Sequence, residues 1–174
     1  MQLYLIRHGI AADRGADYPD DRQRPLTAVG VARMRLEADA LAALGVAFNH
    51  IITSPIVRAR QTADIVAAGG TSSALTLAPP PVTESEALAF EGTPDDVRHV
   101  LAGHPAAASI ALIGHEPNIG ELAAALTGAR SPLRFKKGAV CRIDLVGHRR
   151  GMEGELRWFL TPRMLRALGR STGD

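Results

Sequence analysis

Short runs of consecutive apolar residues alternate along the chain with longer segments in which apolar residues recur at helical spacing. A run of this kind is typical of a strand that is buried on both faces, as in a parallel sheet. The clearest run is residues 3–6, Leu-Tyr-Leu-Ile, and it leads directly into Arg7 and His8. The pattern predicts strands at residues 3–6, in a run that ends near Thr53, and at 109–113, 138–146 and 154–160.

Helix-start and helix-stop residues bound the segments between these runs. Thr27 precedes an Ala- and Leu-rich stretch that ends before Gly45, and Ser54-Pro55 is a good start for a second helix. The expected helices cover 28–44, a segment from Pro55 to about residue 68, 93–103, 118–128 and 161–169, and residues 69–83 are expected to form a surface connection. The alternation of strands and helices predicts one α/β domain over residues 1–174, with a mostly parallel central sheet and helices on both faces in three α/β/α layers.

Polar residues stand at the end of three of the predicted strands. The first strand ends in Arg7-His8-Gly9, the second leads to Arg58 on the first turn of its helix, and the strand at 109–113 ends at His115. Ligands of open α/β sheets bind beyond the carboxyl ends of the strands. If these strands are neighbours, two histidines and two arginines converge on one edge of the sheet.

Two guanidinium groups beside a helix N-terminus form a good site for a phosphoryl group. A neutral imidazole in such a site can attack phosphorus, and Gly9 would let the backbone pass close to the phosphate. The chemistry predicted from the residues is phosphoryl transfer through a phosphohistidine, stabilised by positive charge around the equatorial oxygens.

Three segments of the chain resemble the signature segments of the histidine phosphatase superfamily, in the same order. They are "LIRHG", "SPIVRARQTA" at 54–63 and "LIGHEPNIGEL" at 112–122, and the stretches "RPLTAVG" and "LRWFLTPRML" are similar to the SixA-type phosphohistidine phosphatases. The resemblance implies a phosphoglycerate mutase-like fold. It implies that His8 is the nucleophile, that Arg7 and Arg58 bind the phosphoryl group, and that His115 donates to a phosphoryl oxygen.

The chain departs from the mutases and sugar-bisphosphate phosphatases of this superfamily, which carry a dedicated glutamate acid in a longer segment. The corresponding region here, residues 82–97, is short. Glu86, Glu91 and Asp13 are the candidate acids, and none of them matches the family pattern decisively. A phosphoryl group on an imidazole nitrogen leaves more readily than one on an alkoxide, so we expect a phosphohistidine substrate to need no strong acid.

Composition and charge exclude several other classes. The formal net charge is only +2, which argues against a nucleic-acid-binding protein. The sequence has no secretory signal pattern and no apolar run of membrane-spanning length, so we expect a cytoplasmic protein that does not bind membranes. Position 119 is Ile, so "HE" at 115–116 is not part of an H-E-x-x-H zinc motif. No metal or organic cofactor is expected, and the compact length favours a monomer.

The sequence therefore predicts a phosphohistidine phosphatase that acts on a phosphohistidine-containing protein such as a phosphotransfer domain. One alternative is a phosphatase of the same superfamily for small phosphate monoesters. Another is a binding module that recognises phosphate without catalysis. The only lysines in the sequence, Lys136 and Lys137, face either the mouth of the site, an acidic partner or solvent.

Overall fold

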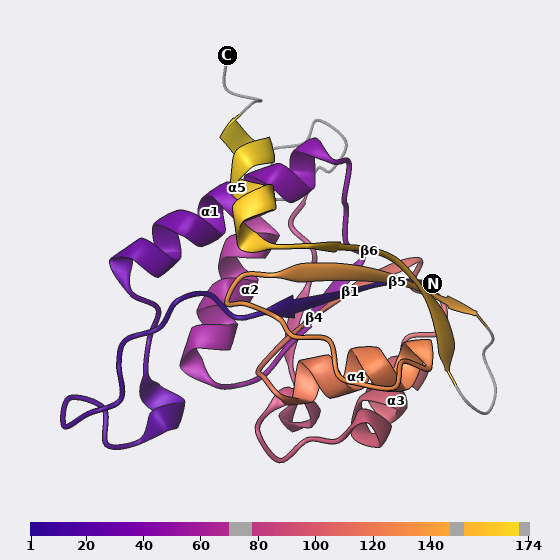
Figure 1. The fold of residues 1–174 in the computed structure, drawn as a ribbon, viewed down its shortest axis with the longest axis horizontal. Helices are drawn as coiled ribbons and strands as arrows, with labels where there is room; N and C mark the ends of the chain where they lie inside the picture. The colour runs from indigo at the N-terminus through magenta and orange to yellow at the C-terminus, as the bar shows by residue number, and fades with distance from the viewer. Residues whose placement is uncertain (70–77, 147–151, 171–174) are drawn as a thin grey trace.

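The computed structural model describes residues 1–69, 78–146 and 152–170. Within these residues, six strands form one sheet in the order β3-β2-β4-β1-β5-β6 (Figure 1). The strands are β1 (Gln2–Arg7), β2 (His50–Thr53), β3 (Val82–Glu84), β4 (Ser109–Gly114), β5 (Val140–Val146) and β6 (Glu153–Leu160). All five predicted strands are confirmed. The short edge strand β3 begins in the region expected to be a connection, and residues 70–77 of that region lie outside the described residues.

The expectation of a mostly parallel sheet is only partly correct. β1, β4, β2 and β3 are parallel neighbours, whereas β5 pairs antiparallel with both β1 and β6. β5 ends at Val146 and β6 begins at Glu153, and a connection of this length reverses the chain. A parallel pair would need a crossover of a dozen residues or more.

Helices cover both faces of the sheet in three layers, as predicted (Figure 1). One face packs against α1 (Ala28–Ala43), α2 (Val57–Gly69) and α5 (Pro162–Arg170), and the other against α3 (Pro94–Ala102) and α4 (Asn118–Thr127). Successive residues of β1 alternate between the two layers: Leu3 and Leu5 face α3 and α4, and Tyr4 and Ile6 face the other helices. Each such fully buried apolar side chain stabilises the fold by about 1.5–3 kcal/mol.

Most helix boundaries follow the local sequence. Thr27 Oγ1 accepts from the backbone N–H of Gly30 at 2.9 Å, which confirms the predicted start of that helix, and Thr93 forms a capping box with Asp96 at the start of α3. The predicted start of the second helix at Pro55 is wrong, since α2 begins at Val57. Ser54 Oγ accepts from the N–H of Ile56, at 3.3 Å, and holds residues 54–56 in a tight turn ahead of the helix.

Candidate active site

The strand ends that carry the polar residues meet at one edge of the sheet. In the parallel pairing of β1 with β4, Arg7 lies opposite Gly114, and in the pairing of β2 with β4, Thr53 lies opposite Ile113. The backbone N–H of His8 donates to the carbonyl of Gly114 at 3.1 Å. The residues that follow these strands therefore occupy one small region, as the sequence predicted.

His8 is held as a neutral imidazole with a free lone pair. Its Nδ1 lies 2.7 Å from the carbonyl oxygen of Gly9, which can only accept, so the ring proton is on Nδ1. Nε2 is then unprotonated, and it accepts from Nε of Arg58 at 3.3 Å. The side chain is 5% exposed. Burial, together with nearby His115, Arg58 and Arg7, holds the pKa of His8 well below its usual range, so Nε2 keeps its lone pair at neutral pH.

Arg58 lies beside His8 and is fixed on both sides. Only 2% of its surface is exposed. Nη1 donates to the backbone oxygen of Asp21 at 2.7 Å, and Nη2 donates to Oδ2 of Asp21 at 2.8 Å. The guanidinium also lies over the ring of Phe90, 5.3 Å from its centroid. The guanidinium therefore has little freedom to leave His8.

Asp21 is a site residue that the sequence analysis missed. It comes from the polar loop between β1 and α1, and its carboxylate also accepts from Arg14 and Arg24. Partial burial raises the pKa of the Asp21 carboxyl, but the hydrogen bonds from Arg58 and Arg14 outweigh it and lower the pKa to about 2. An acid this strong is ionised at neutral pH, so Asp21 orients Arg58 and is unsuited to donate a proton. No motif marks it, because only the fold brings the loop to Arg58.

His115 lies against His8, with 4.9 Å between the ring centroids. Its Nε2 is 3.0 Å from Ser54 Oγ, and Phe90 packs on the ring at 4.8 Å between centroids. Burial and the positive charge of Arg58 lower the pKa of His115 to about 3, so this imidazole is also neutral. Ser54 and Phe90 are two further contacts that the sequence analysis did not predict.

Arg7 is the fourth predicted residue of this group, and it is hydrogen-bonded to the turn before β5. Its Nη1 donates to the carbonyl of Phe135 at 2.6 Å. Arg7 Nε and His115 Nδ1 are buried and have no hydrogen-bond partner within residues 1–69, 78–146 and 152–170. Buried polar atoms are normally paired, and unpaired ones are expected where a polar ligand completes the set. An anion beside His8 is a ligand of this kind.

Two polar side chains tie the elements of the site together. The hydroxyl of Thr62 accepts from the N–H of Gly9 at 3.1 Å and donates to the carbonyl of Arg58 at 2.7 Å, which links the loop after His8 to α2. The amide of Asn118 donates to the carbonyls of Ala89, Phe90 and Gly92, which holds Phe90 in place.

Gly9 also packs closely against α1, while its expected approach to a phosphate stays a prediction. A Cβ at this position would lie 2.6 Å from Met34 Cγ, so the glycine lets the loop pack against α1.

The three candidate acids make other contacts or are exposed. Glu86 binds Arg22 at 2.8 Å and Glu91 approaches the same guanidinium at 4.0 Å, and their side chains are 69% and 80% exposed. Asp13 is exposed. Within the described ranges, no hydrogen bond or ion pair joins Glu86, Glu91 or Asp13 to His8, Arg7, Arg58 or His115.

The described parts of the chain lack two further features. They contain no group of three or more His, Cys, Asp or Glu residues that could hold a metal ion. No helix among the same residues is long and apolar enough to cross a bilayer.

Comparison with known proteins agrees with this arrangement. The sequence model of the histidine phosphatase superfamily (branch 1) matches residues 3–127. The chain is 42% identical over 144 residues to an uncharacterized protein of Picosynechococcus, covering 80% of this chain and 82% of the relative. It is 31% identical over 168 residues to the phosphohistidine phosphatase SixA of Escherichia coli, covering 93% of this chain and 94% of the relative.

A solved structure extends the similarity to the fold. The protein histidine phosphatase SixA, complexed with tungstate, superposes with a TM-score of 0.79 at 29% identity, over 94% of this chain and 98% of that one. The sequence match, the shared fold and the two phosphatase relatives agree. This chain therefore belongs to the histidine phosphatase superfamily, in its SixA-type group, and is a phosphatase.

Proposed function

We propose that the protein removes the phosphoryl group from phosphohistidine in a protein substrate. Nε2 of His8 attacks phosphorus in line, so that the His8–phosphorus bond forms while the bond from phosphorus to the substrate imidazole breaks. The leaving nitrogen takes up a proton from solvent. Water then attacks phospho-His8, which releases inorganic phosphate and returns the neutral imidazole. Arg7, Arg58 and His115 hold the phosphoryl oxygens during both transfers.

The state of His8 supports this role. A nucleophilic imidazole must have a free lone pair at working pH, and the hydrogen bond from Nδ1 to Gly9 leaves that lone pair on Nε2. Nε of Arg58 donates to Nε2 of His8, so the positive charge of Arg58 lies where the phosphoryl group would arrive. The transition state gains chiefly from this positioning and charge.

The choice of phosphohistidine over an alkyl phosphate ester depends on one observation. The carboxylate that reaches Arg58 belongs to Asp21, whose pKa of about 2 makes it a poor proton donor at neutral pH. An alkoxide leaving group needs an acid, whereas an imidazole leaves more readily and is easily protonated. The 31% identity to the phosphohistidine phosphatase SixA points in the same direction.

The test compares phosphate release from a phosphorylated histidine phosphotransfer domain and from p-nitrophenyl phosphate. We expect the wild type to favour the phosphohistidine domain. Without the nucleophile, His8→Ala should lose activity by a factor of about 10⁴ or more. Rapid quenching at alkaline pH should trap an acid-labile phosphoryl group on the wild-type enzyme and none on His8→Ala.

His99→Ala is the matched control, because His99 is a histidine on the outer surface of α3, where its Nδ1 bonds only to the backbone of Asp95. It should retain wild-type rates. Substantial turnover by His8→Ala would overturn the proposed nucleophile. Faster turnover of the ester than of the phosphohistidine domain would instead assign the protein to the phosphatases of small monoesters.

A further inference from the structure

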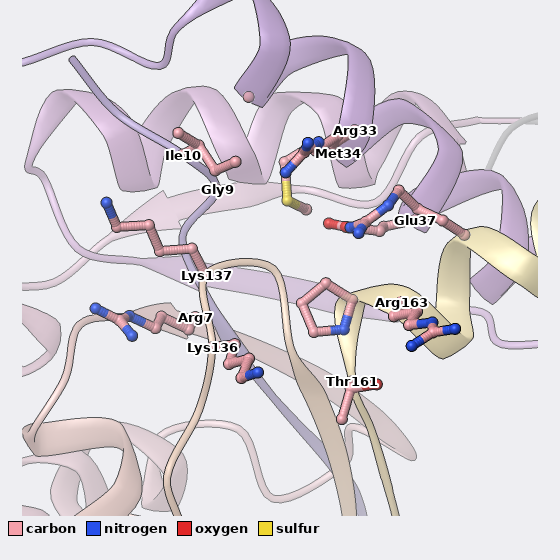
Figure 2. Close-up of a pocket in the computed structure, with 13 residues that line it drawn as sticks. Arg7, Gly9, Ile10, Arg33, Met34, Glu37, Lys136, Lys137, Thr161 and Arg163 are labelled. Atoms are coloured by element: carbon pink, nitrogen blue, oxygen red, sulfur yellow. The ribbon is translucent and has the colours of Figure 1, made fainter.

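A basic cavity adjoins the active site on the side of α1 and α5. It has a volume of about 520 Å³, and Gly9 and Ile10 form part of its wall directly after His8 in the chain. His8, Arg58 and His115 themselves do not line it. Figure 2 shows Arg33 and Glu37 from α1, Lys136 and Lys137 from the turn before β5, and Arg163 from α5 around this opening.

The charge of the cavity is strongly one-sided. Its basic lining residues are Arg7, Arg33, Lys136, Lys137, Arg163 and Arg166, whereas Glu37 is its one acidic lining residue. Glu37 is itself paired with Arg166. Arg33, Lys136, Lys137 and Arg163 are exposed, and none of them forms an ion pair within the described residues. A chain with a formal net charge of only +2 thus concentrates unpaired cations beside its nucleophile.

The turn that carries the two lysines is fixed to the nucleophile's strand. The N–H of Gly138 donates to the carbonyl of Arg7 at 3.1 Å, and the N–H of Arg7 donates to the carbonyl of Ala139 at 3.1 Å. Gly138 has a φ of 86°, and a Cβ there would collide with the carboxylate of Glu37. The turn is therefore packed against α1 and holds the lysines at a defined place beside Arg7.

Glu37 lines the cavity and adds little net negative charge, because it is paired with Arg166. The side chain is buried, and burial raises the pKa of its carboxyl to about 7, although Arg166 and Arg33 oppose that shift. The carboxyl accepts from Arg166 of α5, and this ion pair offsets its charge. The contact joins α1 to α5 under the exposed cations.

The arrangement of the cations indicates the kind of ligand. Figure 2 places the Lys137 ammonium and the Arg163 guanidinium on opposite sides of the opening, so a single small anion does not contact both. The exposed cations come from three separate segments, α1, the turn and α5, and long flexible side chains of this type match several carboxylates on a broad surface.

We infer that this cavity is a docking site for acidic side chains of the protein substrate, which lie on that protein beside its phosphohistidine. The inference rests on the proposed function. The docking site would hold the phosphohistidine protein while His8 reaches the phosphoryl group. Complementary charge of this kind acts on encounter and binding more than on the chemical step.

The test is the double charge reversal R33E/R163E. For a phosphorylated phosphotransfer domain with carboxylates beside its histidine, KM should rise by about thirtyfold with kcat within about twofold of wild type. Turnover of free phosphohistidine should not change. The same phosphotransfer domain with its carboxylates replaced by amides should bind the wild type weakly and show little further loss with the variant. Added salt should weaken the wild type more than the variant.

R35E/R130E is the matched control, since Arg35 and Arg130 are exposed arginines outside the cavity and the change in net charge is the same. It should leave KM near the wild-type value. A milder pair, K136Q/K137Q, tests the same cavity if the reversal lowers the thermal unfolding midpoint.

Two results with R33E/R163E would overturn the docking site: an equal rise in KM for the domain and for free phosphohistidine, or no rise for either. An equal rise in KM with the control R35E/R130E would also overturn it. Wild-type hydrolysis of the domain distinguishes the two proposals. If it is absent, the proposed function fails and the docking site fails with it. If it is present and indifferent to R33E/R163E, the docking site alone fails.

Discussion

The buried site around His8 and the basic cavity beside it use the same residue types in opposite ways. In the buried site Arg58 is 2% exposed, and Asp21, Phe90 and His8 fix its position. In the cavity Arg33 and Arg163 are exposed and have no ion pair among the described residues. A fixed, desolvated cation interacts strongly with charge that develops in a transition state, whereas an exposed one is screened and suits encounter with a partner.

The largest effect should appear when the buried arginine of α2 is removed, compared with removal of a more exposed arginine of the same helix. Arg58→Ala deletes the cation beside Nε2 of His8, and we expect kcat to fall about 10³-fold. Arg60 lies two residues away on the same helix, but its side chain is 40% exposed and bonds to Asp64 and Glu84. Arg60→Ala should stay within about twofold of wild type, because exposed pairs contribute little. Similar losses in both variants would show that burial does not set the role of Arg58.

A smaller effect should follow from Asp21→Asn, which keeps the size of the side chain and removes its charge. Arg58 loses its charged partner and becomes less well oriented, so we expect kcat to fall about tenfold with a smaller change in KM.

Asp13→Asn is the control for this measurement, since Asp13 is exposed in the same loop. Steady-state kinetics with a phosphohistidine substrate would measure both variants. A loss with Asp13→Asn that equals the loss with Asp21→Asn would contradict the positioning role and would restore Asp13 as a candidate acid.

The smallest effect concerns pH and follows from the lowered pKa values of His8 and His115. Both imidazoles should stay neutral as the pH falls from 8 to 5.5, so their carbon-bound ring proton signals in NMR should not shift, unlike those of a histidine model peptide. In the unfolded chain His8 and His115 bind protons near pH 6.5, whereas in the folded state they do not. The free energy of unfolding should therefore fall below pH 6.5, by about 1 kcal/mol per histidine at pH 5.5.

His115→Gln tests the assignment of this pH dependence, because it removes one of the two groups. Chemical denaturation at pH 7.5 and 5.5 should show a smaller loss of stability in the variant than in the wild type. Titration of His8 near pH 6.5 would contradict the neutral, buried state on which the proposed mechanism depends.

Much of this protein could be predicted from local sequence because the responsible interactions are local. The apolar run at residues 3–6 is buried on both faces, and Thr27 and Thr93 cap their helices through neighbouring N–H groups. The three motif segments also place Arg7, His8 and His115 at strand ends and Arg58 on the helix that follows β2, and parallel pairing then brings those ends together. Their catalytic roles remain predictions until the variants are measured.

Only the tertiary structure decided the remaining features, because each of them joins residues that are far apart in the chain. The contact of Asp21 with Arg58 spans 37 positions, and that of Glu37 with Arg166 spans 129. β5 runs antiparallel to β1, and the local apolar pattern does not predict which strand β5 pairs with. Lys136 and Lys137 are equally uninformative as a dipeptide. They acquire a defined place when Gly138 packs against Glu37, because α1, α5 and the lysine turn then surround one cavity. Apolar periodicity and capping thus determine the elements, whereas long-range packing determines which charges are buried and fixed and which stay exposed.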